Sequence, residues 1–263
     1  MMHPYLKQIL AALALWTIAS TAAQAQPSAA IELPHSATPA ASPHWGYEGD
    51  VNPEKWSELS PEYLVCKTGK NQSPVNIERA YSTSLEPLAI HYAITAQDIV
   101  NNGHTIQVTP GSDADYLQLG DQRYTLKQFH FHRPSENQIK GKSYPLEGHF
   151  VHTDKDGHLL VMAVMFELGA KNPQLDQMLD ALHGDGVSEH IKQPIDIDAL
   201  LPKQHDYYRF AGSLTTPPCT EGVTWIVLKH PISLNDAQLK RFETGMHHNN
   251  RPVQPLNGRV VVD

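Results

Sequence analysis

Residues 124–132 read YTLKQFHFH and residues 146–152 read LEGHFVH, and these two stretches decide the fold and its candidate site. Both are strand-type runs, and successive side chains of a strand point to opposite faces of its sheet. His130 and His132 therefore share one face, while the phenylalanines beside them point to the other. If the two stretches are neighbouring strands, His149 meets this pair and three imidazoles converge.

The spacing of the histidines is a weak signal alone, because 16 histidines among 263 residues give roughly one His-x-His pair by chance. Gln128 and Glu147 strengthen it, since each lies two residues before a histidine on the same strand face. A ligating imidazole usually donates its other N–H to a fixed acceptor, which these side chains supply. Each residue taken singly is equally explained as a structural or surface group, so their joint occurrence favours a metal site.

Strand-type segments recur outward from these stretches, separated by Gly and Pro clusters that favour turns. Strands are predicted at Leu88–Tyr92, Thr105–Thr109, Tyr116–Leu119, Tyr124–His132, Leu146–His152, His158–Leu168, Tyr207–Phe210 and Val223–Lys229. Helices are few. One is predicted from the N-cap Asn172 and Pro173 to Gly184, and one from Ser233 to about Gly245. The buried side of the second helix is predicted to hold Leu234, Ala237 and Phe242. The predicted fold class is mainly β (α+β), with the helices packed on a dominant sheet.

The composition is that of an ordinary globular protein, with 40% hydrophobic and 18% charged residues. The formal charge is −8 and no run of Lys or Arg occurs, which removes the attraction that nucleic acids and anionic membranes depend on. We therefore expect neither nucleic acid nor a membrane among the partners of the mature chain.

The N-terminus has the pattern of a secretory signal peptide. Lys7 precedes an apolar run over residues 9–19 that is too short to span a bilayer, and small residues at 23–25 form a cleavage site. A retained anchor is the alternative. No second linker and no repeat occurs further along. The predicted organisation is a signal peptide over 1–25, a flexible Ala/Pro/Ser-rich leader over 26–43 and one domain over 44–263.

The histidine stretches contain the motifs QFHFH at 128–132 and EGHFVH at 147–152, and a third motif, GSLTTPP, lies at 212–218. Together these motifs resemble the α-class carbonic anhydrases, in their bacterial periplasmic branch. Further motifs occur in family order, namely HWGYE at 44–48, QSPVNI at 72–77, NGH at 102–104, VTW at 223–225 and RPVQP at 251–255. The resemblance thus covers most of residues 44–260.

The resemblance implies a large, twisted, mostly antiparallel central sheet with a few short peripheral helices and a conical cavity that holds Zn²⁺ at its floor. The implied ligands are His130, His132 and His149, supported by Gln128, Glu147 and the backbone carbonyl of Asn249. Three neutral imidazoles leave Zn²⁺ one open position, where the pKa of water falls from 15.7 to about 7, a value measured on carbonic anhydrase itself. The implied reaction is the reversible hydration of carbon dioxide to bicarbonate and a proton by the hydroxide held there.

The resemblance also assigns roles around the metal. Thr215 is implied to accept the proton of the hydroxide in a hydrogen bond and to donate its own to Glu136. His104 is implied as the proton shuttle to bulk water, a task that suits an imidazole pKa, and Tyr47 as a residue that orders water on that path. The implied substrate pocket consists of Thr216, Val151, Val161, Leu214 and Trp225, for which ordinary core packing is a rival explanation.

The sequence departs from the usual animal pattern in two places, at three residues. Arg133 and Pro134 follow the second ligand where animal members have Trp-Gly, and Asn137 replaces a histidine after the loop glutamate. The bacterial branch tolerates both changes, so they bear on substrate access and tuning more than on the activity.

Cys66 and Cys219 can form one disulfide in an oxidising compartment, and two buried free thiols are the alternative. A disulfide between them would close a loop of about 153 residues, worth up to roughly 5 kcal/mol in the chain-entropy model. Because Cys219 lies four residues after Thr215, we expect the crosslink also to fix the Thr215 loop.

Other functions stay open beside carbon dioxide hydration. One is a catalytically silent, carbonic-anhydrase-like binding module, and another is a zinc esterase or related zinc hydrolase. A structural zinc site is disfavoured, because such sites use four protein ligands and no cysteine lies beside these histidines. The expected small-molecule partners are carbon dioxide and bicarbonate, and the expected location is the periplasm, with full secretion as the alternative. The oligomeric state, a homodimer included, is left open.

Overall fold

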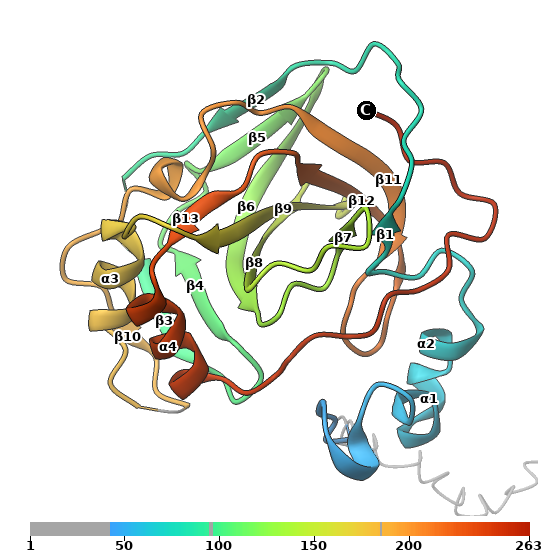
Figure 1. The fold of residues 1–263 in the computed structure, drawn as a ribbon, viewed down its shortest axis with the longest axis horizontal. Coiled ribbons are helices and arrows are strands. Elements are labelled where there is room, and N and C mark those ends of the chain that lie inside the picture. Colours follow the sequence, from blue (N-terminus) through green and yellow to red (C-terminus); the bar gives the residue numbers. More distant parts are fainter. Residues whose placement is uncertain (1–42, 95–96, 185) are drawn as a thin grey trace, which may run out of the picture. The chain divides into compact units, whose positions relative to one another are not determined.

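The strand that carries the first two histidines lies in the middle of a large sheet. In the computed structural model, which describes residues 43–94, 97–184 and 186–263, this strand is β6 (Gln122–His132). It lies between β4 (Ile106–Pro110) and β8 (Leu146–Thr153), antiparallel to both (Figure 1). Beyond β8 lies β9 (Leu159–Leu168), whose almost continuous apolar run is buried on both faces, as expected for a central strand.

Within the described residues, eleven strands form one sheet with the order β10-β3-β4-β6-β8-β9-β12-β11 along its main path. Off this path β13 pairs with β9, and β2 pairs with β5, which in turn pairs with β6. β12 and β13 run parallel to β9, and the other pairs of this sheet are antiparallel. The remaining strands are β1 (Asn76–Ile77), β2 (Leu88–His91), β3 (Gln97–Asn101), β5 (Tyr116–Leu119), β7 (Gln138–Ile139), β10 (Glu189–His190), β11 (Tyr207–Ser213), β12 (Glu221–Leu228) and β13 (Ile232–Leu234).

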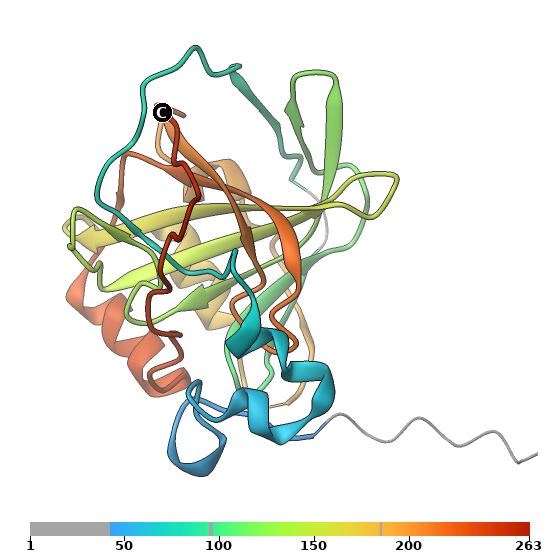
Figure 2. The same ribbon diagram turned by 90° about the vertical axis from the view of Figure 1, so that its right-hand side faces the viewer.

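Each predicted strand is present, with its ends shifted by at most three residues. The sheet is twisted, and the helices are few and short (Figure 2). They are α1 (Trp56–Leu59), α2 (Val65–Thr68), α3 (Pro173–Asp180) and α4 (Asp236–Gly245), with 3-10 turns at Gly49–Val51, Pro61–Tyr63 and Ile197–Leu200. The prediction of a mainly β fold with a mostly antiparallel sheet is confirmed.

The two faces of the sheet bury different sets of side chains. On one face the phenylalanines of β6 and β8 pack with Leu175, Met178 and Phe242 from α3 and α4 in the larger apolar cluster. On the other face a smaller cluster gathers around Trp225 and Val161. Because side chains alternate along β6 and β8, the histidines point away from the larger cluster and toward the smaller one.

Both predicted helices exist, but their limits differ from the prediction. The α-helical part of α3 ends at Asp180, short of Gly184, and the chain continues through two i→i+3 hydrogen bonds of the kind that tighten a last turn. The predicted start of the second helix was wrong, since Ser233 and Leu234 belong to β13, and α4 begins after the N-cap Asn235. Ala237 is exposed instead of buried.

Residues 1–42 lie outside the described part of the chain, so the predicted signal peptide and nearly all of the predicted leader have no structural counterpart here. The described residues from Pro43 onward belong to one compact unit. No helix among the described residues has the length and apolar character to cross a membrane.

Candidate metal centre

The three histidines converge because β6 and β8 are neighbours in register. His130 lies directly opposite His149, and His132 lies opposite Glu147. One ring nitrogen from each histidine falls within 4.8 Å of the others. His132 and His149 are each 1% exposed, and His130 is half-buried. The expected convergence on one sheet face is therefore present.

The other ring nitrogen of each histidine is held by a hydrogen-bond acceptor. The contacts are His130 Nδ1 with Gln128 Oε1 at 2.7 Å, His132 Nδ1 with the Asn249 carbonyl at 2.7 Å, and His149 Nε2 with Glu147 Oε1 at 2.8 Å. A carbonyl or carboxylate oxygen only accepts here, so each ring donates on that side. The nitrogens left as lone pairs are His130 Nε2, His132 Nε2 and His149 Nδ1.

These free nitrogens fit a bound cation. Burial lowers the pKa of all three imidazoles, and the neighbouring histidines lower those of His130 and His149 further, so the neutral form that ligates metal is favoured. His130 Nε2 and His132 Nε2 lie 3.1 Å apart. Two lone pairs facing each other at that distance repel unless a cation lies between them. Three imidazole nitrogens without a sulfur ligand suit zinc with one position open.

Glu147 is fixed from several sides. Its Oε2 accepts the backbone N–H groups of Glu136 and Asn137 at 2.6 and 2.8 Å, and its Oε1 accepts from Asn137 Nδ2 at 2.7 Å. Burial raises the pKa of Glu147 to about 7. The hydrogen bonds from Asn137 favour the charged form and act in the opposite direction. Asn137 also accepts from the Val75 N–H at 3.1 Å. Sequence reasoning noted Asn137 only as a departure from the family, and it missed this role.

Glu136 brings a second buried carboxylate to the centre. It is 1% exposed, and its Oε1 accepts the backbone N–H of Arg251 at 2.7 Å. Its Oε2 has no hydrogen-bond partner among the described residues and lies 3.6 Å from His132 Nε2 and 3.8 Å from His149 Nδ1. Burial raises the pKa of Glu136 well above its usual value, while the Arg251 N–H and the Thr215 hydroxyl act in the opposite direction. Thr215 itself is 5% exposed.

Arg133, the other departure from the animal pattern, connects the end of β6 to two elements. Its backbone N–H donates to Asn249 Oδ1 at 2.7 Å, and its guanidinium donates to Glu243 on α4 at 2.8 Å. Asn249 in turn donates through Nδ2 to the His104 carbonyl at 2.9 Å. Arg133 therefore helps to hold the residue whose carbonyl orients His132.

An aromatic group surrounds the predicted shuttle residue. The His104 ring stacks on Trp45 with 4.0 Å between centroids, and the exposed His44 ring lies 6.1 Å away. Burial lowers the pKa of His104, and the charge of His44 lowers it further. Tyr47 packs edge-on against Trp45 and has a raised pKa, from burial first and from Glu136 second. The roles of His104 and Tyr47 remain predictions.

Four of the five predicted substrate-binding residues contribute to one apolar cluster, and the fifth is the half-buried Thr216, whose carbonyl accepts the Cys219 N–H at 2.8 Å. Val151 and Trp225 both pair with Val161, from opposite sides of β9. Leu214 packs against the same apolar cluster. The edge of the Trp225 ring contacts His149, with 4.9 Å between centroids, and its Nε1 donates to the Ser213 carbonyl. This apolar wall thus reaches the centre, and its role in substrate binding remains a prediction.

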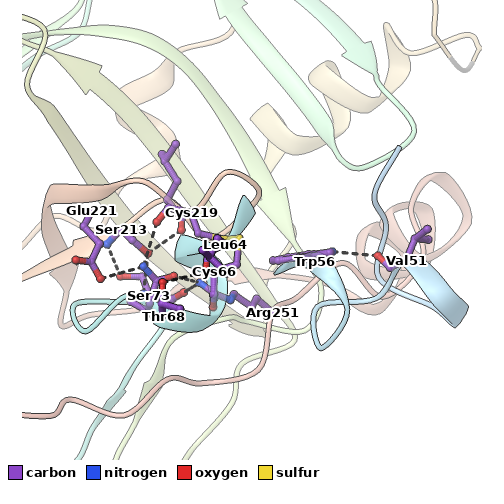
Figure 3. The surroundings of a disulfide bond; sticks show 12 residues. Val51, Trp56, Leu64, Cys66, Thr68, Ser73, Ser213, Cys219, Glu221 and Arg251 are labelled. Atoms are coloured by element: carbon purple, nitrogen blue, oxygen red, sulfur yellow. Dashed lines mark hydrogen bonds between the residues drawn. A yellow bond between two sulfur atoms is a disulfide. The ribbon is translucent and has the colours of Figure 1, made fainter. Parts of the chain in front are cut away.

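The predicted disulfide is confirmed, since Cys66 on α2 is bonded to Cys219, which lies between β11 and β12 (Figure 3). Gln72 Nε2 donates to the Cys219 carbonyl at 3.0 Å, and the Leu214 N–H donates to the Thr220 carbonyl at 2.9 Å. The loop that contains Thr215 is therefore held at its end by a covalent bond.

A second set of metal-type side chains lies in the exposed turn between β8 and β9, with Asp154, Asp156 and His158. Asp154 accepts the backbone N–H groups of the other two residues and bonds the His158 ring. These hydrogen bonds within the turn account for the arrangement without an ion.

The sequence-family model of the eukaryotic-type carbonic anhydrases matches residues 51–263 of this chain. This chain belongs to that family. A carbonic anhydrase of Pectobacterium atrosepticum is 52% identical over 231 residues, which cover 86% of this chain and 93% of that protein. The α-carbonic anhydrase of Thermovibrio ammonificans, solved with the inhibitor sulfanilamide, superposes with a TM-score of 0.82 and 48% identity, covering 85% of this chain and 100% of that one. These relatives show that the chain is an enzyme of the carbonic anhydrase kind, and the predicted resemblance is confirmed.

The carbonic anhydrase fold also occurs under another name. The structure of dioscorin complexed with ascorbate superposes with a TM-score of 0.78 and 29% identity, covering 83% of this chain and 97% of that one. A shared fold does not fix a function by itself, so the function is argued from the residues of the centre.

Proposed function

We propose that this carbonic anhydrase hydrates carbon dioxide reversibly to bicarbonate and a proton at a zinc ion held by His130, His132 and His149. The observation that carries the proposal is the set of three free ring nitrogens, each fixed by a hydrogen bond on the opposite side of its ring. When bound, zinc supplies a Lewis acid that lowers the pKa of water to about 7, which makes hydroxide available at neutral pH.

Thr215 and Glu136 orient the nucleophile. A carboxylate only accepts hydrogen bonds, so Glu136 accepts a hydrogen bond from the Thr215 hydroxyl, whose oxygen is then left as an acceptor. The Thr215 oxygen would then accept a hydrogen bond from a hydroxide at the open position of a bound zinc ion. Burial raises the pKa of Glu136, but a dication beside it favours the ionised form that this arrangement needs.

His104 moves the released proton from the centre to bulk water. Its lowered pKa favours the neutral ring at pH 7, and the neutral ring is the form that accepts a proton. Tyr47, which packs edge-on against the Trp45 ring on which His104 stacks, orders the water between the centre and His104. Carbon dioxide carries no charge, so Val151, Val161, Leu214 and Trp225 receive it by apolar contact, next to Thr216.

We further propose that the chain works in the periplasm. The disulfide between Cys66 and Cys219 suits an oxidising compartment outside the cytoplasm, and the N-terminal sequence has the signal-peptide pattern. Release of mature chain into the medium instead of the periplasm, measured after cell fractionation, would favour full secretion.

Stopped-flow carbon dioxide hydration and cleavage of an activated ester, both measured on one zinc-loaded sample, test the proposed reaction. We expect hydration to be much the faster of the two. Ester cleavage without hydration would identify a zinc hydrolase instead. One zinc per chain with neither activity would identify a silent binding module. Thermal shift with sulfanilamide adds a readout that does not depend on turnover, and we expect the sulfonamide to raise Tm.

A further inference from the structure

Arg251 is a buried arginine whose guanidinium makes no ion pair with any carboxylate of the described residues. It is 2% exposed, and burial lowers its pKa to about 10. Its guanidinium donates to three uncharged acceptors, namely the Cys66 carbonyl at 2.6 Å, the Ser73 carbonyl at 2.8 Å and Gln72 Oε1 at 2.9 Å. A buried charge is costly and persists only where its hydrogen bonds are well made, so this cradle holds the side chain in one place.

The backbone of the same residue holds Glu136. The Arg251 N–H donates to Glu136 Oε1 at 2.7 Å, which leaves Oε2 as the oxygen directed toward the histidines. The chain around residue 251 belongs to no helix or strand, so no ladder of backbone hydrogen bonds fixes that N–H. Asn249 anchors the segment on its N-terminal side through the Arg133 carbonyl. The guanidinium supplies the corresponding anchor at residue 251.

The cradle is tied to the Thr215 loop from the other side. Cys66 is bonded to Cys219, Gln72 Nε2 donates to the Cys219 carbonyl, and the Ser73 N–H donates to Ser213 Oγ at 2.9 Å. Figure 3 shows the Arg251 side chain lying beside Cys66 and Ser73, close to the disulfide. Arg251 therefore connects the Glu136 carboxylate to the residues that hold the loop of Thr215, whose hydroxyl is the partner of Glu136.

We propose that Arg251 is a positioning residue that fixes Glu136 relative to Thr215 through its cradle on Cys66, Gln72 and Ser73. This inference rests on the proposed role of Glu136 and Thr215 in orienting the nucleophile. Arg251 touches neither substrate nor metal ligand, and it acts by holding one backbone N–H in place. A displaced Glu136 would weaken the hydration step and leave proton transfer through His104 unchanged.

Arg259 is a matched control within the same part of the chain. Its guanidinium also lies among carbonyl acceptors, donating to Gln72, Ala211 and Pro255, and burial also lowers its pKa. Its described hydrogen bonds do not include Glu136. Replacement of Arg259 therefore measures how far kcat/KM falls when the chain loses a guanidinium that is bonded to carbonyl groups but not linked to Glu136.

The experiment compares Arg251→Lys and Arg251→Met with Arg259→Lys and Arg259→Met in zinc-loaded protein. We expect kcat/KM for hydration to fall about tenfold in Arg251→Lys and further in Arg251→Met, since small misplacements of a catalytic group cost up to about 10²-fold. We expect kcat, which proton transfer limits, to fall less, and both Arg259 variants to stay within about twofold of wild type. Equal losses of kcat and kcat/KM, or equal effects at both arginines, would overturn the proposal.

Two further measurements keep the test decisive. If the Arg251 variants do not fold, Gln72→Met is measured instead, because it removes one acceptor of the cradle. We expect a roughly threefold loss of kcat/KM. An unchanged kcat/KM would refute the proposal. Hydrogen exchange of the amide of residue 251 needs no turnover. We expect faster exchange in Arg251→Lys than in Arg259→Lys, and equal rates would contradict the inference even if the chain hydrated no carbon dioxide.

Discussion

Asn249 shows how one residue serves several parts of the centre. Its carbonyl accepts from His132, its Oδ1 accepts from the Arg133 N–H, and its Nδ2 donates to the carbonyl of His104. His132, a proposed ligand, and His104, the predicted shuttle residue, are therefore both positioned by the side chain and peptide group of Asn249. The orientation of an imidazole is set by its second nitrogen, so this contact selects Nε2 of His132 for the metal.

Replacement of His104 by alanine tests its role. We expect kcat for hydration in weak buffer to fall about 10-fold or more, with kcat/KM nearly unchanged, because proton transfer and hydration are separate steps. Small imidazole buffers should restore kcat. His183→Ala, at an exposed ring far along the chain, serves as the control. If His104→Ala and His183→Ala had equal kcat in weak buffer, His104 would not be the proton shuttle.

The direction of the His104 pKa gives a pH dependence for the same step. A lowered pKa means that the ring stays neutral, and able to accept a proton, to a more acidic pH than an ordinary histidine. We therefore expect the acid limb of the kcat profile below pH 6.5. His44→Ala removes the charge that contributes to the shift, so the limb should move toward higher pH. A limb at or above pH 6.5 in wild type would contradict this assignment.

Sequence reasoning predicted that the three histidines converge and that Gln128 and Glu147 bond two of them from i−2, because strand alternation fixes which side chains share a face. It did not find the contacts of Asn137 and Arg251. The contact of Arg251 with Glu136 joins residues 115 apart in the sequence, and that of Asn137 with Val75 joins residues 62 apart. Asn137 and Glu147 are 10 residues apart, but they meet only because the chain after β6 turns back to β8. Hydrophobic periodicity reports only local structure, so it does not reveal such contacts. The sequence showed only that Asn137 and Arg251 are polar residues in or beside a motif, with no helix or strand pattern that explains them.

At the scale of elements, α4 is held at its start by a capping box. Asn235 Oδ1 accepts the Gln238 N–H, and Gln238 Oε1 accepts the Asn235 N–H. Gln238 also donates to Asn172 and to Asp176, so the same side chain fastens α4 to α3. The two helices are thus joined by several polar contacts, beside the apolar cluster that they cover.

Asn235→Ala removes this cap. We expect a loss of about 1 kcal/mol in the free energy of unfolding, which corresponds to a decrease in Tm of about 2–4 °C. Asn235→Asp keeps an acceptor oxygen and should remain near wild type, and hydration activity should be unchanged in both. Calorimetry of the three proteins makes the comparison. Identical Tm values for Asn235→Ala and wild type would show that the cap is not needed.

Elements with a clear apolar pattern were predictable, and those without one were not. β3 was missed because two of its three buried residues are polar, Gln97 and Asn101. Gln97 is accommodated by hydrogen bonds to the Ile195 backbone, which only the fold reveals. β13 has three residues, too few for a period to show, and the Asn235 to Gln238 spacing was the available sign that α4 begins after it.

At the scale of the whole molecule, the disulfide joins segments separated by 153 residues. The order of the strands could not be derived from local patterns, and the family resemblance implied only a large, twisted, mostly antiparallel sheet. The single possible cysteine pairing was readable from composition, because the chain has two cysteines. The crosslink connects α2 to the loop of Thr215, far from it in sequence.

Cys66→Ser with Cys219→Ser tests this connection. We expect the free energy of unfolding to fall by up to about 5 kcal/mol, since a long loop of the unfolded chain is released. We also expect kcat/KM for hydration to fall, because the Thr215 loop loses its covalent support. Urea unfolding and stopped-flow assays measure the two effects. Reduced or doubly substituted protein that stayed fully stable and active would exclude a role for the crosslink.

The central claim is that three histidines hold one zinc ion that the hydration of carbon dioxide requires. It is tested most directly by returning zinc to chelated protein while stopped-flow hydration is measured, with wild type and His149→Ala in parallel. We predict that wild-type activity rises and saturates at about one zinc per chain, and that His149→Ala shows no comparable rise. Undiminished hydration by the chelated protein or by His149→Ala would contradict the account.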